Sequence, residues 1–264
     1  MLQAHVLPEF LSAHPLLQAR ACWVYSEFSA YEFGDKTHIQ QAVDAIYQRL
    51  FSEHLPVKFA AALALSQMIK IDAAVDFLKP ALQNILEVYL KLMQDVDSEE
   101  LIGSLEAFME KYADDIGPYA VQLAQQLTTK YRSLVTDDNG EDEDLEEEKA
   151  LAAAGCVTAI RRILEACSKD PQQLRQILPI IYPILLHSLT PDGLDCIEEG
   201  LDCINIFIYH ACNRDSGVPV EIWKLLPQML FITAGNADDV DGGFAFEMLA
   251  QVAICLQNFI ARDP

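Results

Sequence analysis

Apolar residues recur at three- and four-residue steps along almost the whole chain, which is the period of an amphipathic helix. The stripe is clearest in the segment 73–95, where it consists of Leu78, Leu82, Ile85, Leu86, Tyr89 and Met93. The sequence has no run of strict apolar–polar alternation bounded by hairpin turns. The pattern therefore predicts an all-α protein.

Short polar turns divide the helical segments into six pairs. We predict these pairs at 2–11 and 15–33, 37–52 and 56–70, 73–95 and 98–114, 118–136 and 147–168, 171–189 and 192–212, and 219–234 and 242–261. Prolines recur in the same setting, inside an apolar segment that a second helix follows: Leu7-Pro8, Lys79-Pro80, Leu178-Pro179 and Leu226-Pro227. The intervals of 72, 99 and 48 residues fit units of about 36 to 50 residues. Such a period is typical of a helical solenoid.

A proline inside a helix removes a backbone hydrogen bond and kinks the helix, so we expect a kink at the same place in successive units. For Pro118 and Pro171 we expect the start of a helix instead. A solenoid presents long surfaces and has no buried cleft by default, which favours binding over catalysis. Neither end of the sequence has a polar cap, so we expect residues 1–264 to form a single solenoid segment that is part of a longer solenoid or stacks against one.

The formal net charge is −22, and 52% of the residues are apolar, which is ample for a core. Phosphate binding needs a basic face, so the acidic balance argues against nucleic acid and favours a basic polypeptide as partner. The longest apolar run, Ile177 to Leu186, has ten residues and two prolines. It is too short to span a bilayer, and we expect no membrane partner.

One acidic tract lies between the two helices of the fourth pair. It holds nine acids and no base between residues 137 and 148: Asp137, Asp138, Glu141, Asp142, Glu143, Asp144, Glu146, Glu147 and Glu148. Like charges repel, so we expect a flexible acidic loop at about 137–148. It can attract lysine- and arginine-rich proteins over a long range, and we take the nine acids as candidate partner-binding residues. The alternative is a solvated linker whose last acids favour the next helix N-terminus.

Residues for catalysis or metal binding are scarce. If the tract were an EF-hand calcium loop, Val135 would occupy the first ligand position, which needs a carboxylate. We therefore reject a calcium site there. The seven cysteines include no C-x-x-C pair and sit among apolar residues, as reduced core thiols of a cytosolic or nuclear protein do. No nucleotide-binding, metalloprotease or nucleophile-elbow motif occurs. We predict no catalytic residue, no cofactor and no metal, and hence no enzyme.

Three stretches resemble one known family. They are Leu16 to Val24, which contains Arg20-Ala21-Cys22-Trp23; Leu55 to Leu65, which contains Pro56-Val57-Lys58; and Ile222 to Pro227. All three resemble the importin-β (karyopherin-β) superfamily of nuclear transport receptors, most closely its importin-seven/eight branch. That branch also carries an acidic inter-helix loop. The resemblance covers essentially the whole chain and corresponds to a middle segment of such receptors.

The resemblance implies an α-α superhelix of HEAT/armadillo-like repeats, here a right-handed solenoid of about six repeats. It implies nuclear import of basic cargo proteins, such as ribosomal proteins and histones, by a receptor that shuttles between cytoplasm and nucleus. It also implies release of cargo by the GTPase Ran in its GTP form, bound through repeats mostly outside this segment. The alternative is a HEAT-repeat scaffold subunit that organises a protein complex without transport.

Five aromatic residues crowd one predicted helix: Trp23, Tyr25, Phe28, Tyr31 and Phe33. They cannot all face a single apolar stripe. The resemblance implies that some line a groove for Phe-Gly repeats of nucleoporins. Packing against the next helix pair is the alternative.

Overall fold

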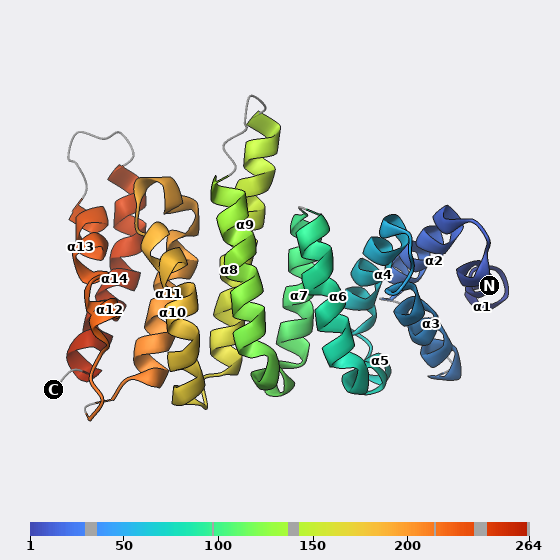
Figure 1. Ribbon diagram of the computed structural model, residues 1–264, viewed down its shortest axis with the longest axis horizontal. Helices are drawn as coiled ribbons and strands as arrows, with labels where there is room; N and C mark the ends of the chain where they lie inside the picture. The colour runs from blue at the N-terminus through green and yellow to red at the C-terminus, as the bar shows by residue number, and fades with distance from the viewer. Residues whose placement is uncertain (30–35, 97, 137–142, 214, 235–241, 263–264) are drawn as a thin grey trace. The chain divides into compact units, whose positions relative to one another are not determined.

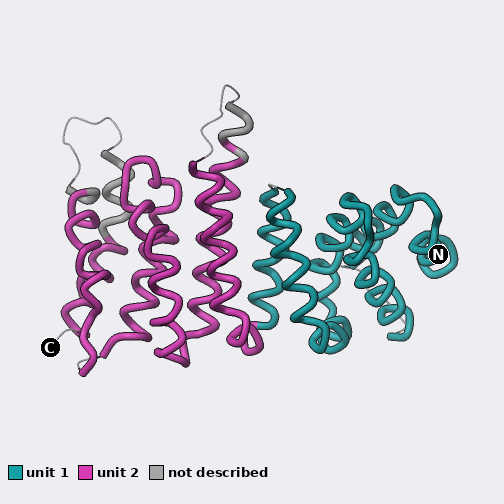
Figure 2. The backbone as a smooth tube through the Cα atoms, viewed as in Figure 1, with its two compact units in different colours: residues 1–112 teal, residues 113–264 magenta. Residues whose placement is uncertain are grey.

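The computed structural model describes the backbone of residues 1–29, 36–96, 98–136, 143–213, 215–234 and 242–262. Within these ranges the side chains of 143–146, 148, 232–234 and 242–249 lie outside the description. The chain divides into two compact units, Met1–Tyr112 and Ala113–Pro264 (Figure 2). In the described ranges every regular element is a helix, so the all-α fold class is confirmed and is of the HEAT-repeat type.

The first unit is a succession of packed helices (Figure 1). Its elements are α1 (Leu2–His5), η1 (Leu7–Leu11), α2 (Pro15–Glu27), α3 (Lys36–Arg49), α4 (Leu55–Met68), α5 (Asp72–Leu78), η2 (Lys79–Ala81), α6 (Leu82–Asp95) and α7 (Glu99–Lys111). The second helices of successive pairs pack on one another, α2 on α4 and α4 on α7. Ala61, Ala62 and Ala64 of α4 are fully buried, and such small side chains let neighbouring helices approach closely.

The second unit repeats this arrangement with longer helices (Figure 1). Its elements are η3 (Ala113–Asp115), η4 (Gly117–Tyr119), α8 (Ala120–Thr136), α9 (Glu143–Ala166), α10 (Pro171–His187), η5 (Pro191–Cys196), α11 (Ile197–Ala211), α12 (Val220–Trp223), α13 (Leu226–Ala234) and α14 (Gly242–Arg262). Helix α8 pairs with α9, α10 with α11, and α13 with α14. The second helices again form a row, in which α11 packs between α9 and α14.

Arginine and tyrosine side chains join elements that are distant in sequence. Arg49 of α3 donates Nη1 to the carbonyl oxygen of Phe10 at 2.6 Å. The buried Tyr89 donates its hydroxyl to the carbonyl oxygen of Ala62 at 2.6 Å. A buried polar group costs free energy unless it is hydrogen-bonded, so these bonds both satisfy the groups and fix the neighbouring helices.

Of the four recurring prolines, one lies in the interior of a helix, so the prolines do not recur in the same structural position as expected. Pro179 lies inside α10, together with Pro183. Pro8 and Pro80 instead occupy 3-10 turns, and Pro227 lies in the first turn of α13. A proline costs little in a first turn, because its missing N–H would have no partner inside the helix there.

The six predicted pairs match the observed order of helices, but several limits differ. The predicted helix 2–11 is divided into α1 and η1, and the predicted helix 219–234 into α12 and α13. Helix α2 ends at Glu27 instead of 33, and Pro80 divides the segment predicted as one helix over 73–95. Helix α9 begins at Glu143, four residues before its predicted start at 147. Pro171 is the first residue of α10, as predicted. Pro118 lies in η4, and α8 follows it directly from Ala120. That residues 1–264 form a single solenoid segment remains a prediction.

Candidate functional site

The acidic tract spans the start of α9. Asp137, Asp138, Glu141 and Asp142 lie outside the described residues. The remaining five acids belong to the first two turns of the helix: Glu143, Asp144, Glu146, Glu147 and Glu148. This half of the tract is therefore helical, where we expected a loop over 137–148. Carboxylates are stabilising at a helix N-terminus, because the helix dipole is positive there.

Helix α9 separates its charges along its length. Glu147, the tract acid whose side chain is described, is exposed. Nearer the other end, Arg161 and Arg162 both bind Glu165, with nitrogen–oxygen distances of 2.8 and 3.1 Å. These bases are partly neutralised within their own helix.

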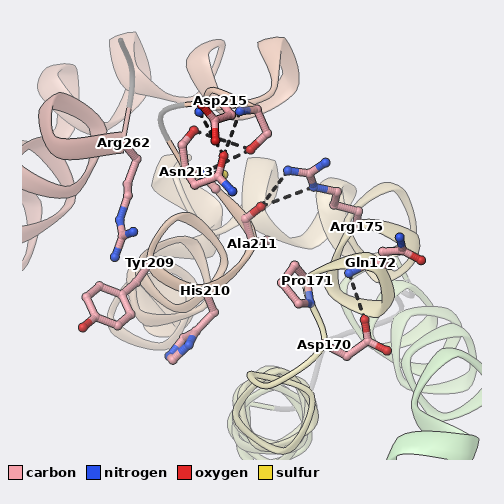
Figure 3. Close-up of a pocket in the computed structure, with 12 residues that line it drawn as sticks. Asp170, Pro171, Gln172, Arg175, Tyr209, His210, Ala211, Asn213, Asp215 and Arg262 are labelled. Carbon is pink, nitrogen blue, oxygen red and sulfur yellow. Dashed lines mark hydrogen bonds between the residues drawn. The ribbon is translucent and has the colours of Figure 1, made fainter.

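The second unit also contains an open pocket of about 690 Å³ (Figure 3). It lies between the start of α10, the end of α11, the loop that follows α11 and the end of α14. Its exposed surface is more apolar than polar, although most of the lining residues have polar groups. The lining consists of Asp170, Pro171, Gln172, Arg175, Tyr209, His210, Ala211, Cys212, Asn213, Asp215, Ser216 and Arg262. The sequence analysis did not predict this pocket.

Hydrogen bonds hold the walls of the pocket (Figure 3). Arg175 donates to the carbonyl oxygen of Ala211 from Nη2 at 2.8 Å and from Nε at 3.3 Å. Asp170 caps α10, accepting the backbone N–H groups of Gln172 and Gln173 at 3.0 and 3.2 Å. Such a cap stabilises a helix by about 1 kcal/mol. The sequence signal for this wall was the Asp170-Pro171 pair, which marks a helix start.

The groups that bear most on the chemistry of the pocket are the Cys212 thiol and the Arg262 guanidinium. Burial raises the pKa of the Cys212 thiol to about 11, although Arg175 and Arg262 act to lower it. The thiol is therefore protonated at neutral pH and is a poor nucleophile. The guanidinium of Arg262 lies over the ring of Tyr209, with Cζ at 4.8 Å from the ring centroid. The pocket therefore offers a mostly apolar surface with a few charged and polar groups, which suits binding and not nucleophilic chemistry.

The other six cysteines are also buried. All seven are free and buried, and burial raises the pKa of Cys22 to about 12 and that of Cys167 to about 11. Across the residues that the structure describes, no three histidine, cysteine or acidic side chains gather as a metal site would require. Within the same residues no helix is long and apolar enough to cross a membrane.

The aromatic residues of α2 divide between core and surface. Tyr25 is fully buried, and its hydroxyl lies 2.8 Å from Nε2 of His38. Trp23 is 44% exposed. The guanidinium of Arg20 lies over its ring, with Cζ at 3.6 Å from the ring centroid. Phe28 is 42% exposed. The expectations for Tyr31 and Phe33 lie outside the described residues.

Comparison with known proteins shows one consistent likeness, although no protein-family model matches the chain. The chain is 32% identical to the importin beta-like SAD2 homolog of Arabidopsis thaliana over 262 residues, which is 99% of this chain and 24% of that protein. It is 28% identical to the probable importin-7 homolog of Dictyostelium discoideum over 87% of this chain and 21% of that one. It is 26% identical to importin-8 of Mus musculus over 99% of this chain and 24% of that one.

The chain thus spans about a quarter of the length of these curated relatives. The likeness runs through both compact units, because it covers nearly all of the 264 residues. Fold and relatives agree with the resemblance seen in the sequence. The chain belongs to the importin-β superfamily.

Proposed function

We propose that this chain is a protein-binding segment of a nuclear transport receptor that carries basic cargo proteins into the nucleus. The observation that carries the proposal is the likeness to proteins named importins over 99% of the chain. The formal net charge of −22 supports a basic partner. The receptor binds its cargo without catalysis and shuttles between cytoplasm and nucleus.

The acidic tract is the proposed contact for basic cargo. Its acids run from the segment before α9 into the first turns of that helix. An exposed cluster of one sign attracts an oppositely charged protein over roughly one Debye length, about 8 Å at physiological salt. Such steering raises the association rate and tolerates different cargo sequences. It fits a receptor for many lysine- and arginine-rich proteins.

Two further partners belong to the proposal. Ran in its GTP form releases the cargo and binds through repeats mostly outside this chain. Phe-Gly repeats of nucleoporins bind exposed aromatic side chains, and of the five aromatic residues singled out in the sequence Trp23 and Phe28 are partly exposed. A ring with one exposed face can pack against a phenylalanine of such a repeat.

The experiment compares two variants of the chain with the same change in net charge. One neutralises the tract, as D137N/D138N/E141Q/D142N. The other neutralises four acids that are exposed elsewhere, as E110Q/D192N/D195N/E221Q. The probe is a lysine-rich histone-tail peptide, and its affinity is measured at several salt concentrations.

The tract variant should bind the peptide on the order of tenfold more weakly, because each exposed charge contributes up to about 1 kcal/mol. Its affinity should also depend less on salt. The dispersed variant should lose clearly less affinity. Equal losses of affinity in the two variants would show that the tract acts only through the overall negative charge of the chain and is not a specific contact. Unchanged affinity at low salt would remove it from cargo binding.

A further inference from the structure

A row of polar side chains follows the line where α11 packs against α14. On α11 the spacing of four, three and four residues puts its members on one face: Glu198, Asp202, Asn205 and Tyr209. On α14 a spacing of seven and four does the same: Gln251, Asn258 and Arg262. We call these seven residues the α11–α14 seam. All are exposed or partly exposed to solvent.

Three contacts connect the two sides of the seam. Gln251 donates Nε2 to Oε1 of Glu198 at 3.2 Å. Seven residues along each helix, Asn258 donates Nδ2 to Oδ1 of Asn205 at 3.2 Å. Four residues further along, Arg262 lies over the ring of Tyr209. The two helices therefore keep one register over the whole seam.

Apolar packing beneath the seam fixes this register. Val252, Cys255 and Phe259 of α14 are buried, at spacings of three and four residues. Leu201, Ile204 and Ile208 of α11 are buried in the same way. The Cys255 thiol lies 3.8 Å from the carbonyl oxygen of Leu201. The polar side chains thus stand on a packed base, which reduces the entropy that a ligand must remove.

The first end of the seam is negative. Partial burial raises the pKa of Asp202, Arg161 lowers it, and the nearby Glu198 and Glu165 raise it further. Like charges this close destabilise each other's ionised form. A cation placed beside Asp202 and Glu198 would relieve this repulsion.

The other end of the seam carries the cation Arg262 and opens into the pocket, whose lining also includes Asp170 and Asp215. Arg262 lines that pocket, and Arg175 lies across it. Two nitrogens of Arg175, Nε and Nη2, already donate to the Ala211 carbonyl, so Arg262 is the better placed cation for a ligand. In Figure 3, Arg262 and Tyr209 lie on one side of the pocket and Asp170 on the other.

We propose that the α11–α14 seam binds an extended peptide segment of a partner protein, with a lysine or arginine at the acidic end and an aspartate or glutamate at Arg262. Glu198 and Tyr209 are eleven residues apart on one helix, which corresponds to about 16 Å along its axis. An extended chain covers that length with about five residues. Asn205 and Asn258 stand between the charged ends, and side-chain amides both donate to and accept from a peptide backbone.

Charge complementarity selects this partner over others. A phosphate-rich ligand would meet Glu198 and Asp202, and a purely basic peptide would meet Arg262. Like-charge contacts of this kind exclude wrong partners more strongly than matched contacts reward right ones. The inference rests on the proposed role of the chain as a protein-binding segment, but it concerns a different site from the acidic tract.

The test titrates the ¹⁵N-labelled chain with three acetylated and amidated pentapeptides. They are Lys-Ser-Ala-Ser-Glu, Lys-Ser-Ala-Ser-Lys and Glu-Ser-Ala-Ser-Glu. The side-chain amide signals of Asn205 and Asn258 report binding at the seam. We expect these signals to shift and saturate, with the mixed-charge peptide binding at least about threefold more tightly than either control peptide.

Variants then assign the two ends. Arg262→Gln should weaken the mixed peptide about threefold and leave the Lys–Lys peptide no weaker than before. Glu198→Gln should weaken both peptides that contain lysine. Lys224→Gln and Glu221→Gln are matched controls, because both side chains are exposed in the same unit and lie outside the seam. Neither should change the affinity.

Two results would overturn the seam proposal: absence of saturable shifts at Asn205 and Asn258, or equal affinities for the three peptides. If tract-dependent binding of the histone-tail peptide persists in that case, only the seam proposal fails. If the seam binds as expected but neutralising the tract has no effect, only the proposed role of the tract in cargo binding fails.

Discussion

Gly200 of α11 lies directly against the side chain of Ser188 at the end of α10, and no space remains there for a Cβ atom. Ser188 is fully buried, and its hydroxyl donates to the carbonyl oxygen of Leu185 at 3.1 Å. It is therefore held in place and cannot yield easily. The close approach of α10 and α11 thus depends on a glycine inside a helix, where glycine is otherwise unfavourable.

Gly200→Ala should destabilise the chain by about 1–2 kcal/mol. Overpacking costs about 1–3 kcal/mol, and the better helix propensity of alanine offsets up to about 1 kcal/mol. Gly103→Ala is the matched control, because Gly103 is an exposed helical glycine of α7 with nothing within 4 Å of its added Cβ. That variant should gain about 0.5–1 kcal/mol. Urea unfolding measures both, and changes of the same sign would contradict the packing described.

Arg175→Ala should cost about 1.5–3 kcal/mol of stability, because it removes two charge-assisted hydrogen bonds to the Ala211 carbonyl. Arg175→Lys keeps the charge but cannot reproduce the two-nitrogen geometry, so it should fall between Ala and the native residue. Lys169→Ala is the control, since Lys169 and its partner Asp114 are both largely exposed. Thermal unfolding would refute the role of this bond if Arg175→Ala and Lys169→Ala lost equally little.

Stability should fall as the pH rises above 9. Burial raises the pKa of Cys22 and of Cys255 from 9.0 to about 12. Between these values the thiol ionises in the unfolded chain and stays protonated in the folded one. The stability is complete below pH 9 and is lost progressively toward pH 12. One unit above the unfolded value the loss is about 1.4 kcal/mol per thiol.

Urea unfolding at pH 8 and pH 10 measures this loss. A C22A/C255A variant should lose less stability between the two pH values than the native chain does. The comparison is made between slopes, because removing the side chains also lowers stability at both pH values. Identical losses in the two proteins would show that these thiols do not respond to pH as their burial requires.

The fold was largely predictable because helix periodicity is a local property. The spacing of Leu82, Ile85 and Leu86 predicts one buried stripe, and all three residues are buried in α6. The details of proline were not predictable, because tertiary packing decides them. Pro179 stays inside α10, whereas Pro80 breaks its segment into α5 and α6.

The candidate sites differ in how much the sequence shows. The acidic tract is visible because its nine charges are contiguous. The seam joins Glu198 to Gln251 and Asn205 to Asn258. The residues of each pair are 53 positions apart, so no short sequence motif predicts the seam. Its available signal was the three- and four-residue spacing of polar side chains on α11. That signal is ambiguous without the neighbouring helix.

The most direct measurement follows basic nuclear proteins bound to the full-length protein that contains this chain. Ribosomal proteins or histones are captured first, and Ran is then added in its GTP or its GDP form. We predict release by the GTP form alone, with weaker initial capture when the four acids Asp137, Asp138, Glu141 and Asp142 are neutralised. Cargo that stays bound whichever nucleotide Ran carries would contradict a transport receptor and indicate a static scaffold.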